Sequence, residues 1–403
     1  MQSHIKQLKN IIKRDANPPE DRPKTKSGRN FDFRKYKSRH IAIKLLYFGW
    51  DYRGFAAQED TQQTIESALF DALIKTRLIR SRQTSNYHRC GRTDKGVSAF
   101  SQIISIDVRT NLKTGKGVIT PEDYIESEDK SQTKEEINYS LILNNVLPEN
   151  IRIICWTAVE PKFSARFDCK SRTYKYFFPK GDLDIERIRI GCNHLLGEHD
   201  FRNLCKMDVN NGVVNYKRNI LSTHLTQYST PNNLTNSCLD ESYSMCCLTI
   251  TGTAFLWHQI RCIVALLFLI GQHKEEPQII SELLDVEKHP NKPQYCMSAD
   301  FPLVLFDCSY SESDINQWVY DSKALEQLIR HLQNLWTKQV IKTEIIQSMV
   351  SCLTNELKSV NTSEEMTNIC SQIEPLCMGA QNKVYKPLFE RPFCGSFIFL
   401  IDF

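Results

Sequence analysis

From residue 40 onward the chain alternates short strand-like and helix-like segments, and this alternation restricts the fold more than any other feature. Residues 64–80 carry Ile65, Leu69 and Leu73 at helical spacing, with Thr64 placed as the N-cap. Apolar positions alternate, as in β-strands, over 40–49, 98–110, 151–160, 172–180 and 243–255, and an apolar helix begins near 258. Polar, hairpin-like connections separate several runs, so we predict an α+β fold rather than a doubly wound parallel sheet.

The segment CGRTDKGVSA at 90–99 comes close to a phosphate-binding loop. Gly91 and Gly96 have the spacing of G-x-x-x-x-G-K-[ST], and Ser98 stands at the hydroxyl position. Val97, however, occupies the place of the lysine that would reach the phosphates of a nucleoside triphosphate. The sequence therefore excludes an NTPase loop here.

What remains in this segment is Asp94, between Arg92 and Lys95, in a turn that Gly96 can close with a positive φ. The neighbouring cations are expected to lower the pKa of Asp94 and to keep it ionised. Such a carboxylate could be a nucleophile, a general base or only an ion-pair partner within a turn. The local sequence leaves these alternatives open.

Further cations stand among aromatic or strand residues. Arg166 lies in FSARF, Arg172 and Tyr174 lie in SRTYKYFF, and Arg261 lies in WHQIRC. Cations interleaved with aromatic rings suit a surface that neutralises phosphates and stacks bases, although aromatic strand residues also fill cores. Arg261 precedes the uncharged run CIVALLFLIG (262–271) at the start of the apolar helix, where it needs a partner such as Asp94.

Charge and cysteine content restrict the class of protein. The 403 residues carry a net charge of +4. Residues 1–39 alone carry +8, so the rest of the chain carries about −4. This basic arm is either a phosphate-contacting tail or a solvated leader. No apolar run reaches the length of a membrane helix or forms a secretory signal. The 15 cysteines include no Cys-x-x-Cys, so we expect reduced, mostly buried thiols, no structural zinc ribbon and no bound metal.

The motifs GRTDKGVSA, FSARF with SRTYKYFF, LLGEHDFRNLC and AFLWHQIRCIVALLFLIG occur in the same order as in the TruA-type tRNA pseudouridine synthases, which the chain resembles from about 40 to 310. YFGWDYRGFAAQED and MSADFPLVLFDC are most similar to the eukaryotic branch that modifies positions 38 and 39 of the anticodon stem-loop. The resemblance implies two similar α/β halves whose antiparallel sheets meet at a central basic cleft. We place the halves at 40–160 (with a polar insertion or loop at 110–136) and 161–310, followed by a helical extension at 311–403.

The resemblance also implies an activity and roles for single residues. Uridine in tRNA would be isomerised to pseudouridine without a cofactor, after the target base is flipped into a pocket. Asp94 matches the catalytic Asp, Tyr174 the active-site Tyr that packs on the base, and Arg261 the basic residue that pairs with the Asp. Arg92 matches the motif Arg that helps to extrude the nucleotide. We expect Lys95, Arg166 and Arg172 to contact the RNA.

The sequence leaves two alternative functions open. One is the sister eukaryotic branch that modifies positions 27 and 28, and the other is a catalytically silent RNA-binding protein on the same fold. The bacterial relatives act as homodimers, so we expect a homodimer, with the cytoplasm, the nucleus or both as its location.

Overall fold

The computed structural model describes residues 31–126, 135–206, 214–228, 243–360, 372–378 and 384–394. Most of the predicted basic arm at 1–39 lies outside these residues. Ten strands form one sheet: β1 (Lys37–Tyr47), β2 (His88–Arg89), β3 (Ser98–Thr110), β4 (Val118–Ile119), β5 (Ile151–Ala158), β6 (Ser171–Pro179), β7 (Gly197–Asp200), β8 (Lys217–Gln227), β9 (Met245–Gly252) and β10 (Leu303–Ser309).

The α-helices among these described residues are α2 (Ile65–Lys75), α3 (Tyr139–Asn144), α4 (Ile185–Asn193), α6 (Gln259–Gly271), α7 (Ile279–Leu284) and α8 (Ser322–Val360). Short 3-10 turns cover Phe33–Lys35, Arg202–Leu204, Glu374–Leu376 and Leu388–Glu390. Thr64 caps α2 as predicted, since its side chain accepts a hydrogen bond from the Ser67 amide. The helix ends earlier than the predicted residue 80, because Arg77 adopts a φ of +56° that no α-helix accommodates.

The main path through the sheet runs β4-β1-β3-β10-β6-β9-β8-β7, while β5 pairs with β1 and β2 pairs with β3. All of these pairs are antiparallel except β10 with β3, which is parallel. The predicted α+β class is therefore confirmed. The two sheets are joined into one, since Leu305 of β10 faces Ala99 on one side and Tyr174 on the other.

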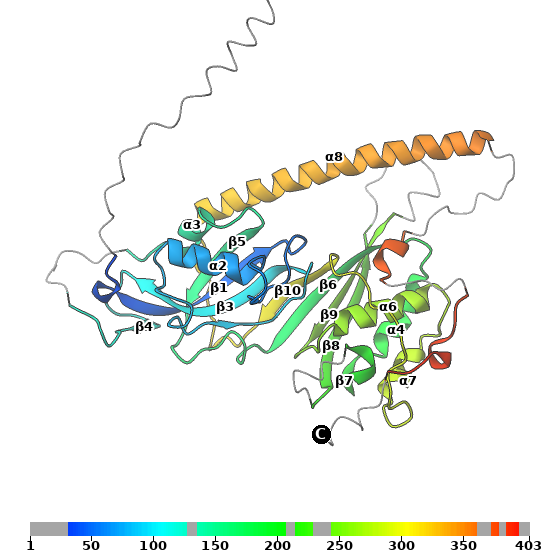
Figure 1. The fold of residues 1–403 in the computed structure, drawn as a ribbon, viewed down its shortest axis with the longest axis horizontal. Helices are drawn as coiled ribbons and strands as arrows, with labels where there is room; N and C mark the ends of the chain where they lie inside the picture. Colours follow the sequence, from blue (N-terminus) through cyan, green and yellow to red (C-terminus); the bar gives the residue numbers. More distant parts are fainter. Residues whose placement is uncertain are drawn as a thin grey trace, which may run out of the picture.

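The helices lie in two groups on either side of this junction (Figure 1), and each group packs on an apolar core of its own. The first core packs α2 and α3 on β1, β3 and β5, and the second packs α4, α6 and α7 on β6, β8 and β9. Tyr174 contacts both cores. The predicted boundary near residue 160 stays a prediction. Strand β10 belongs to both cores, because it contributes Leu303 to the second and Leu305 to the first.

Two predicted peripheral segments contain more regular structure than expected. The insertion at 110–136 is not a loop throughout, because β4 within it pairs with Ser38 and Arg39 of β1. In the C-terminal extension, the described residues include α8, a continuous helix of 39 residues that runs past both halves of the molecule (Figure 1). No helix among the described residues is both long and apolar enough to cross a membrane.

Candidate active site

The loop that carries Asp94 is fastened to the sheet on both sides. The side chain of Gln102, fully buried on β3, accepts a hydrogen bond from the Gly91 amide (3.3 Å) and donates one to the Gly91 carbonyl (2.9 Å). The Thr93 carbonyl accepts from the Phe55 amide at 3.1 Å, and the Thr93 hydroxyl lies 2.7 Å from that of Tyr47. These bonds fix the backbone on which the carboxylate stands, as a reacting group requires.

Gly96 closes the turn, as predicted, with a φ of +78°. A Cβ at this position would lie 2.7 Å from Oδ1 of Asp300, which approaches from the loop before β10. On the other side of the loop, a Cβ on Gly49 would lie 2.0 Å from the Val97 carbonyl oxygen. Gly49 is required by the close approach of the Val97 backbone, and Gly96 is favoured by its positive φ, with the Asp300 side chain adding to the cost of a Cβ.

The Asp94 carboxylate meets the residues at the start of α6. Trp257 donates its indole Nε1–H to Oδ1 at 3.2 Å, and Nε2 of His258 lies 3.4 Å from Oδ2. The Asp94 side chain keeps 27% of its surface exposed, so it remains accessible to a substrate. Trp257 and His258 were not singled out from the sequence, although both lie inside the motif AFLWHQIRC that carried the resemblance.

The expected depression of the Asp94 pKa is wrong. Burial raises the pKa of Asp94, and the nearby charge of Asp300 adds to this, while Arg261, the Trp257 hydrogen bond and Lys206 act in the opposite direction. Arg92 and Lys95 are adjacent in sequence, but both are exposed. The fold decides the direction because it takes the carboxylate out of water, whereas the sequence shows only which cations are its neighbours.

His258 sits beside Asp94 in a strained backbone conformation, with φ +58° and ψ +11°, at the N-cap of α6. Burial, followed by the positive charges of Arg261, Lys206 and Lys292, lowers the pKa of His258 to about 4. The imidazole is therefore neutral near pH 7. Its Nδ1 is buried without a hydrogen-bond partner among the described residues, which favours the tautomer with the proton on Nε2, toward Asp94.

Arg261 lies in the first turn of α6 and is 4% exposed. Its Nε donates to the Ser298 carbonyl at 2.8 Å, and Nη2 lies 3.7 Å from Sδ of Met378. Within the described part of the chain it makes no ion pair with Asp94 at 4 Å or less, so the predicted direct pair is not formed in this structure. Its charge still acts on Asp94 over a longer distance, lowering the pKa of that carboxyl.

Tyr174 stands at the junction of the two cores and packs edge-on against Phe255, with ring centroids 5.2 Å apart. Phe255 precedes Trp257 by two residues, and Trp257 is hydrogen-bonded to Asp94. Tyr174 and Asp94 therefore contact the same segment, residues 255–257. Burial raises the pKa of Tyr174 well above its usual range. Its hydroxyl forms no hydrogen bond with the residues that the structure describes.

Beside the Asp94 loop, a pocket of about 500 Å³ is lined by cations and polar side chains: Arg82, Gln83, Asn86, Tyr87, His88, Arg89 and Arg166. Glu66 of α2, fully buried, accepts hydrogen bonds from Arg82 (2.8 Å) and Arg89. The like charge of Arg89, followed by burial and the like charge of Arg166, lowers the pKa of Arg92. Crowded cations of this kind are typical of a polyanion site.

The other predicted cations differ in their surroundings. Arg172 donates to three backbone carbonyls, those of Thr253 (2.8 Å), Cys90 (3.1 Å) and Arg166 (3.2 Å). It therefore ties together three segments around the site. Lys95 is exposed and forms no ion pair within the described ranges. RNA contact by either residue stays a prediction.

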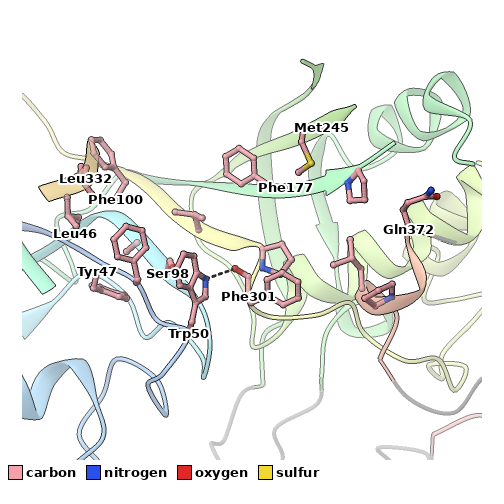
Figure 2. A pocket seen from close by; sticks show the side chains of 17 residues that line it. Leu46, Tyr47, Trp50, Ser98, Phe100, Phe177, Met245, Phe301, Leu332 and Gln372 are labelled. Atoms are coloured by element: carbon pink, nitrogen blue, oxygen red, sulfur yellow. Dashed lines mark hydrogen bonds between the residues drawn. The ribbon is translucent and has the colours of Figure 1, made fainter. Parts of the chain in front are cut away.

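A larger pocket of about 650 Å³ lies elsewhere, among apolar side chains from both halves (Figure 2). Trp50 donates its Nε1–H to the Phe301 carbonyl at 3.2 Å across it, and Leu332 of α8 and Leu376 also line it. None of the predicted site residues lines this pocket. Its apolar walls do not suit a polyanionic substrate.

Similarity to known proteins agrees with this geometry. Residues 192–311 match a protein family described as tRNA pseudouridine synthase. A tRNA pseudouridine(38/39) synthase of Homo sapiens is 47% identical over 379 residues, which cover 92% of this chain and 77% of the human protein. A probable tRNA pseudouridine synthase of Caenorhabditis elegans is 40% identical over 336 residues, or 82% of each chain. The tRNA pseudouridine synthase A of Methanothrix thermoacetophila is 27% identical over 311 residues, which cover 77% of this chain and 97% of that protein.

The fold and these similarities define an RNA-modifying isomerase of the pseudouridine synthase class. The chain belongs to the TruA-type tRNA pseudouridine synthases, as the sequence motifs predicted.

Proposed function

We propose that this enzyme converts uridine to pseudouridine at positions 38 and 39 of the tRNA anticodon stem-loop, with Asp94 as the catalytic residue. Relatives named for these two positions support the choice of site. The observation that carries the role of Asp94 is its position: a partly exposed carboxylate on a fastened glycine turn, hydrogen-bonded to Trp257, on a loop whose first residue directly follows Arg89 of the cationic pocket.

In this reaction the bond between N1 of uracil and C1′ of ribose breaks and a bond between C5 and C1′ forms. The proton on C5 leaves and N1 gains a proton, so the product is an isomer. Asp94 would act on the ribose or the base as a carboxylate, a form that needs no activation by another group. Tyr174 would pack on the flipped base, and the positive charge of Arg261 would favour the ionised form of Asp94.

The cationic pocket would hold phosphates of the stem-loop. Glu66 is a positioning residue in this proposal, because it fixes Arg82 and Arg89 without facing the RNA itself. Arg166, which lines the same pocket as Arg82 and Arg89, would contact the same backbone. Arg92 would help to displace the nucleotide from its stack.

The test is modification of tRNA transcripts in vitro, with uridine at 38 and 39 and with cytidine at both positions. Pseudouridine is mapped by carbodiimide chemistry in single-turnover reactions. Asp94→Asn should lower the rate by about a thousandfold or more while tRNA binding is retained. Asp51→Asn, an exposed carboxylate on the neighbouring loop, is the matched control and should keep the wild-type rate.

Other outcomes would contradict parts of the proposal. A wild-type rate for Asp94→Asn would exclude its catalytic role. Modification at 27 and 28 would indicate the sister specificity, and tight binding without any modification would indicate a silent RNA-binding protein.

We further propose that the enzyme is a homodimer joined through α8. The first turns of α8 are packed, with Leu328 6% exposed, but farther along it exposes Trp336, Ile346, Met349 and Leu353 by 60% to 71%. Residues 346, 349 and 353 lie three and four positions apart and so form one stripe, which a second copy could cover. Light scattering should give the mass of a dimer, and Leu353→Lys should lower it toward that of one chain.

The cytoplasm, the nucleus or both are the proposed location, in keeping with a tRNA substrate. All 13 cysteines that the structure describes are free thiols, which supports a reducing compartment. Microscopy of a fluorescent fusion would test this.

A further inference from the structure

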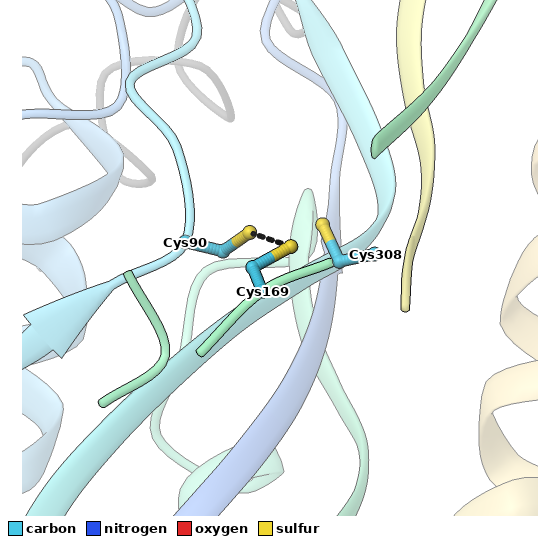
Figure 3. Close-up of side chains that lie close together, drawn as sticks. All are labelled: Cys90, Cys169 and Cys308. Atoms are coloured by element: carbon cyan, nitrogen blue, oxygen red, sulfur yellow. Dashed lines mark hydrogen bonds between the residues drawn. The ribbon is translucent and has the colours of Figure 1, made fainter. Parts of the chain in front are cut away.

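Three cysteines that are far apart in sequence meet next to the Asp94 loop (Figure 3). Cys90 follows β2 and directly precedes Gly91, Cys169 lies in the loop before β6, and Cys308 lies on β10. Their Sγ atoms all lie within 4.8 Å of one another, and those of Cys90 and Cys169 are 3.4 Å apart. Within the described residues this is the single group of potential ligand atoms that lie close enough to share a metal ion.

The spacing of these sulfurs is close to that of thiolates on one cation. Zinc–sulfur bonds of about 2.3 Å in a tetrahedral arrangement separate two sulfurs by about 3.8 Å. Only small shifts are needed to reach this value from the separations observed. A disulfide would use two of the three thiols and would leave the convergence of the third without an explanation.

The thiolate is the form of cysteine that binds metals, and three thiolates held this close together need positive charge beside them.

Arg172 provides the positive charge that would balance the thiolates. Its Nη2 donates to the Cys90 carbonyl at 3.1 Å, so its guanidinium is fixed beside the sulfurs. Three thiolates with one Zn²⁺ carry a net charge of −1, which the guanidinium balances to zero. Charge balance matters here because Cys90 and Cys308 are 3% and 5% exposed, and buried charges need compensation.

We propose that Cys90, Cys169 and Cys308 bind one thiophilic cation, Zn²⁺ or Cu⁺, with Zn²⁺ favoured by the charge balance. Binding displaces the thiol protons, and a water molecule completes the zinc shell on the side of Cys169, which is partly exposed. The ion would link the start of the Asp94 loop to β10 and to the loop that carries Arg166. This inference does not depend on the proposed tRNA specificity.

The experiment measures metal content and stability rather than activity. The full chain is produced in medium supplemented with zinc or with copper, purified under reduction and analysed by elemental mass spectrometry. Cys169→Ser and Cys308→Ser each remove one ligand, and Cys296→Ser, an exposed free thiol, is the matched control. Zn²⁺, Co²⁺ and Cu⁺ are also titrated into metal-free wild-type protein, so that the test does not depend on variants that fold poorly.

The expected result is about one zinc per chain in the wild type and in Cys296→Ser, and a loss in both other variants. Co²⁺ should give thiolate-to-metal charge-transfer absorption, and Zn²⁺ should raise the melting temperature. Copper in place of zinc, removed by a Cu⁺-specific chelator, would assign the site to Cu⁺. Wild-type protein that takes up neither ion, or a Cys90–Cys169 disulfide found in freshly prepared protein, would overturn the proposal.

Discussion

The neutral state of His258 can be tested through the pH dependence of stability. The perturbation is His258→Asn, which removes the titrating ring at a position with φ +58° where asparagine is tolerated. His258 is suited to this test because its side chain is only 9% exposed and lies 3.4 Å from Asp94.

The magnitude follows from the lowering of the His258 pKa from 6.5 to about 4 in the folded protein. Because the folded pKa is depressed, the unfolded chain takes up the proton first as the pH falls. Stability is complete above pH 6.5 and is lost progressively as the pH falls toward 4. Between about pH 7.5 and about pH 5 the loss amounts to about 2 kcal/mol, with a limit of about 3.4 kcal/mol at lower pH.

The assay is urea denaturation of the wild type and of His258→Asn at both pH values. The wild type should lose about 2 kcal/mol more than the variant, and any contribution that both chains share cancels in the difference. His273→Asn at pH 7.5 measures the cost of asparagine at a positive φ, since His273 has a φ of +55° and is 61% exposed. Equal losses in the wild type and in His258→Asn would refute the reasoning that the imidazole beside Asp94 is buried and neutral.

Three further predictions concern the same region. Gly96→Ala should destabilise the protein by about 1–3 kcal/mol in urea denaturation, because φ is +78° and its Cβ would lie 2.7 Å from Asp300; Gly197→Ala, at φ +97° with its nearest neighbour 3.7 Å away, should cost less, and equal costs would contradict the steric argument. Trp257→Phe removes a hydrogen bond that lowers the pKa of Asp94, so the acidic limb of the single-turnover pH–rate profile should move to higher pH; an unmoved limb would mean that this bond does not act on Asp94. Glu66→Gln should cost about 1–3 kcal/mol in denaturation and weaken tRNA binding, because two partly exposed arginines lose the buried carboxylate that holds them, whereas the exposed control Glu160→Gln should change neither.

Several features of the fold could be predicted from residue types within a few positions of one another. The cap of α2, the positive φ of Gly96 and the start of the apolar helix near 258 follow from rules that act over a few residues, and all three are present in the structure. The family was also readable from short motifs, because these motifs keep their residue types and order along the chain.

The sequence could not determine what distant segments do to one another. Asp94 has cations as sequence neighbours, yet its pKa is raised, because tertiary packing removes its water and brings Trp257 and His258 to its oxygens. Arg261 was expected to contact Asp94 directly, but the Ser298 carbonyl holds its Nε. Cys90 and Cys169 are 79 residues apart and no local spacing marks them as partners, yet the parallel pairing of β10 with β3 and the turn before β6 bring them together with Cys308. The sequence by itself determined the class of fold, the loop and the family, since these depend on local residue types; only the tertiary structure decided the electrostatics of Asp94 and the thiol cluster, because burial and long-range contacts exist only in the folded chain.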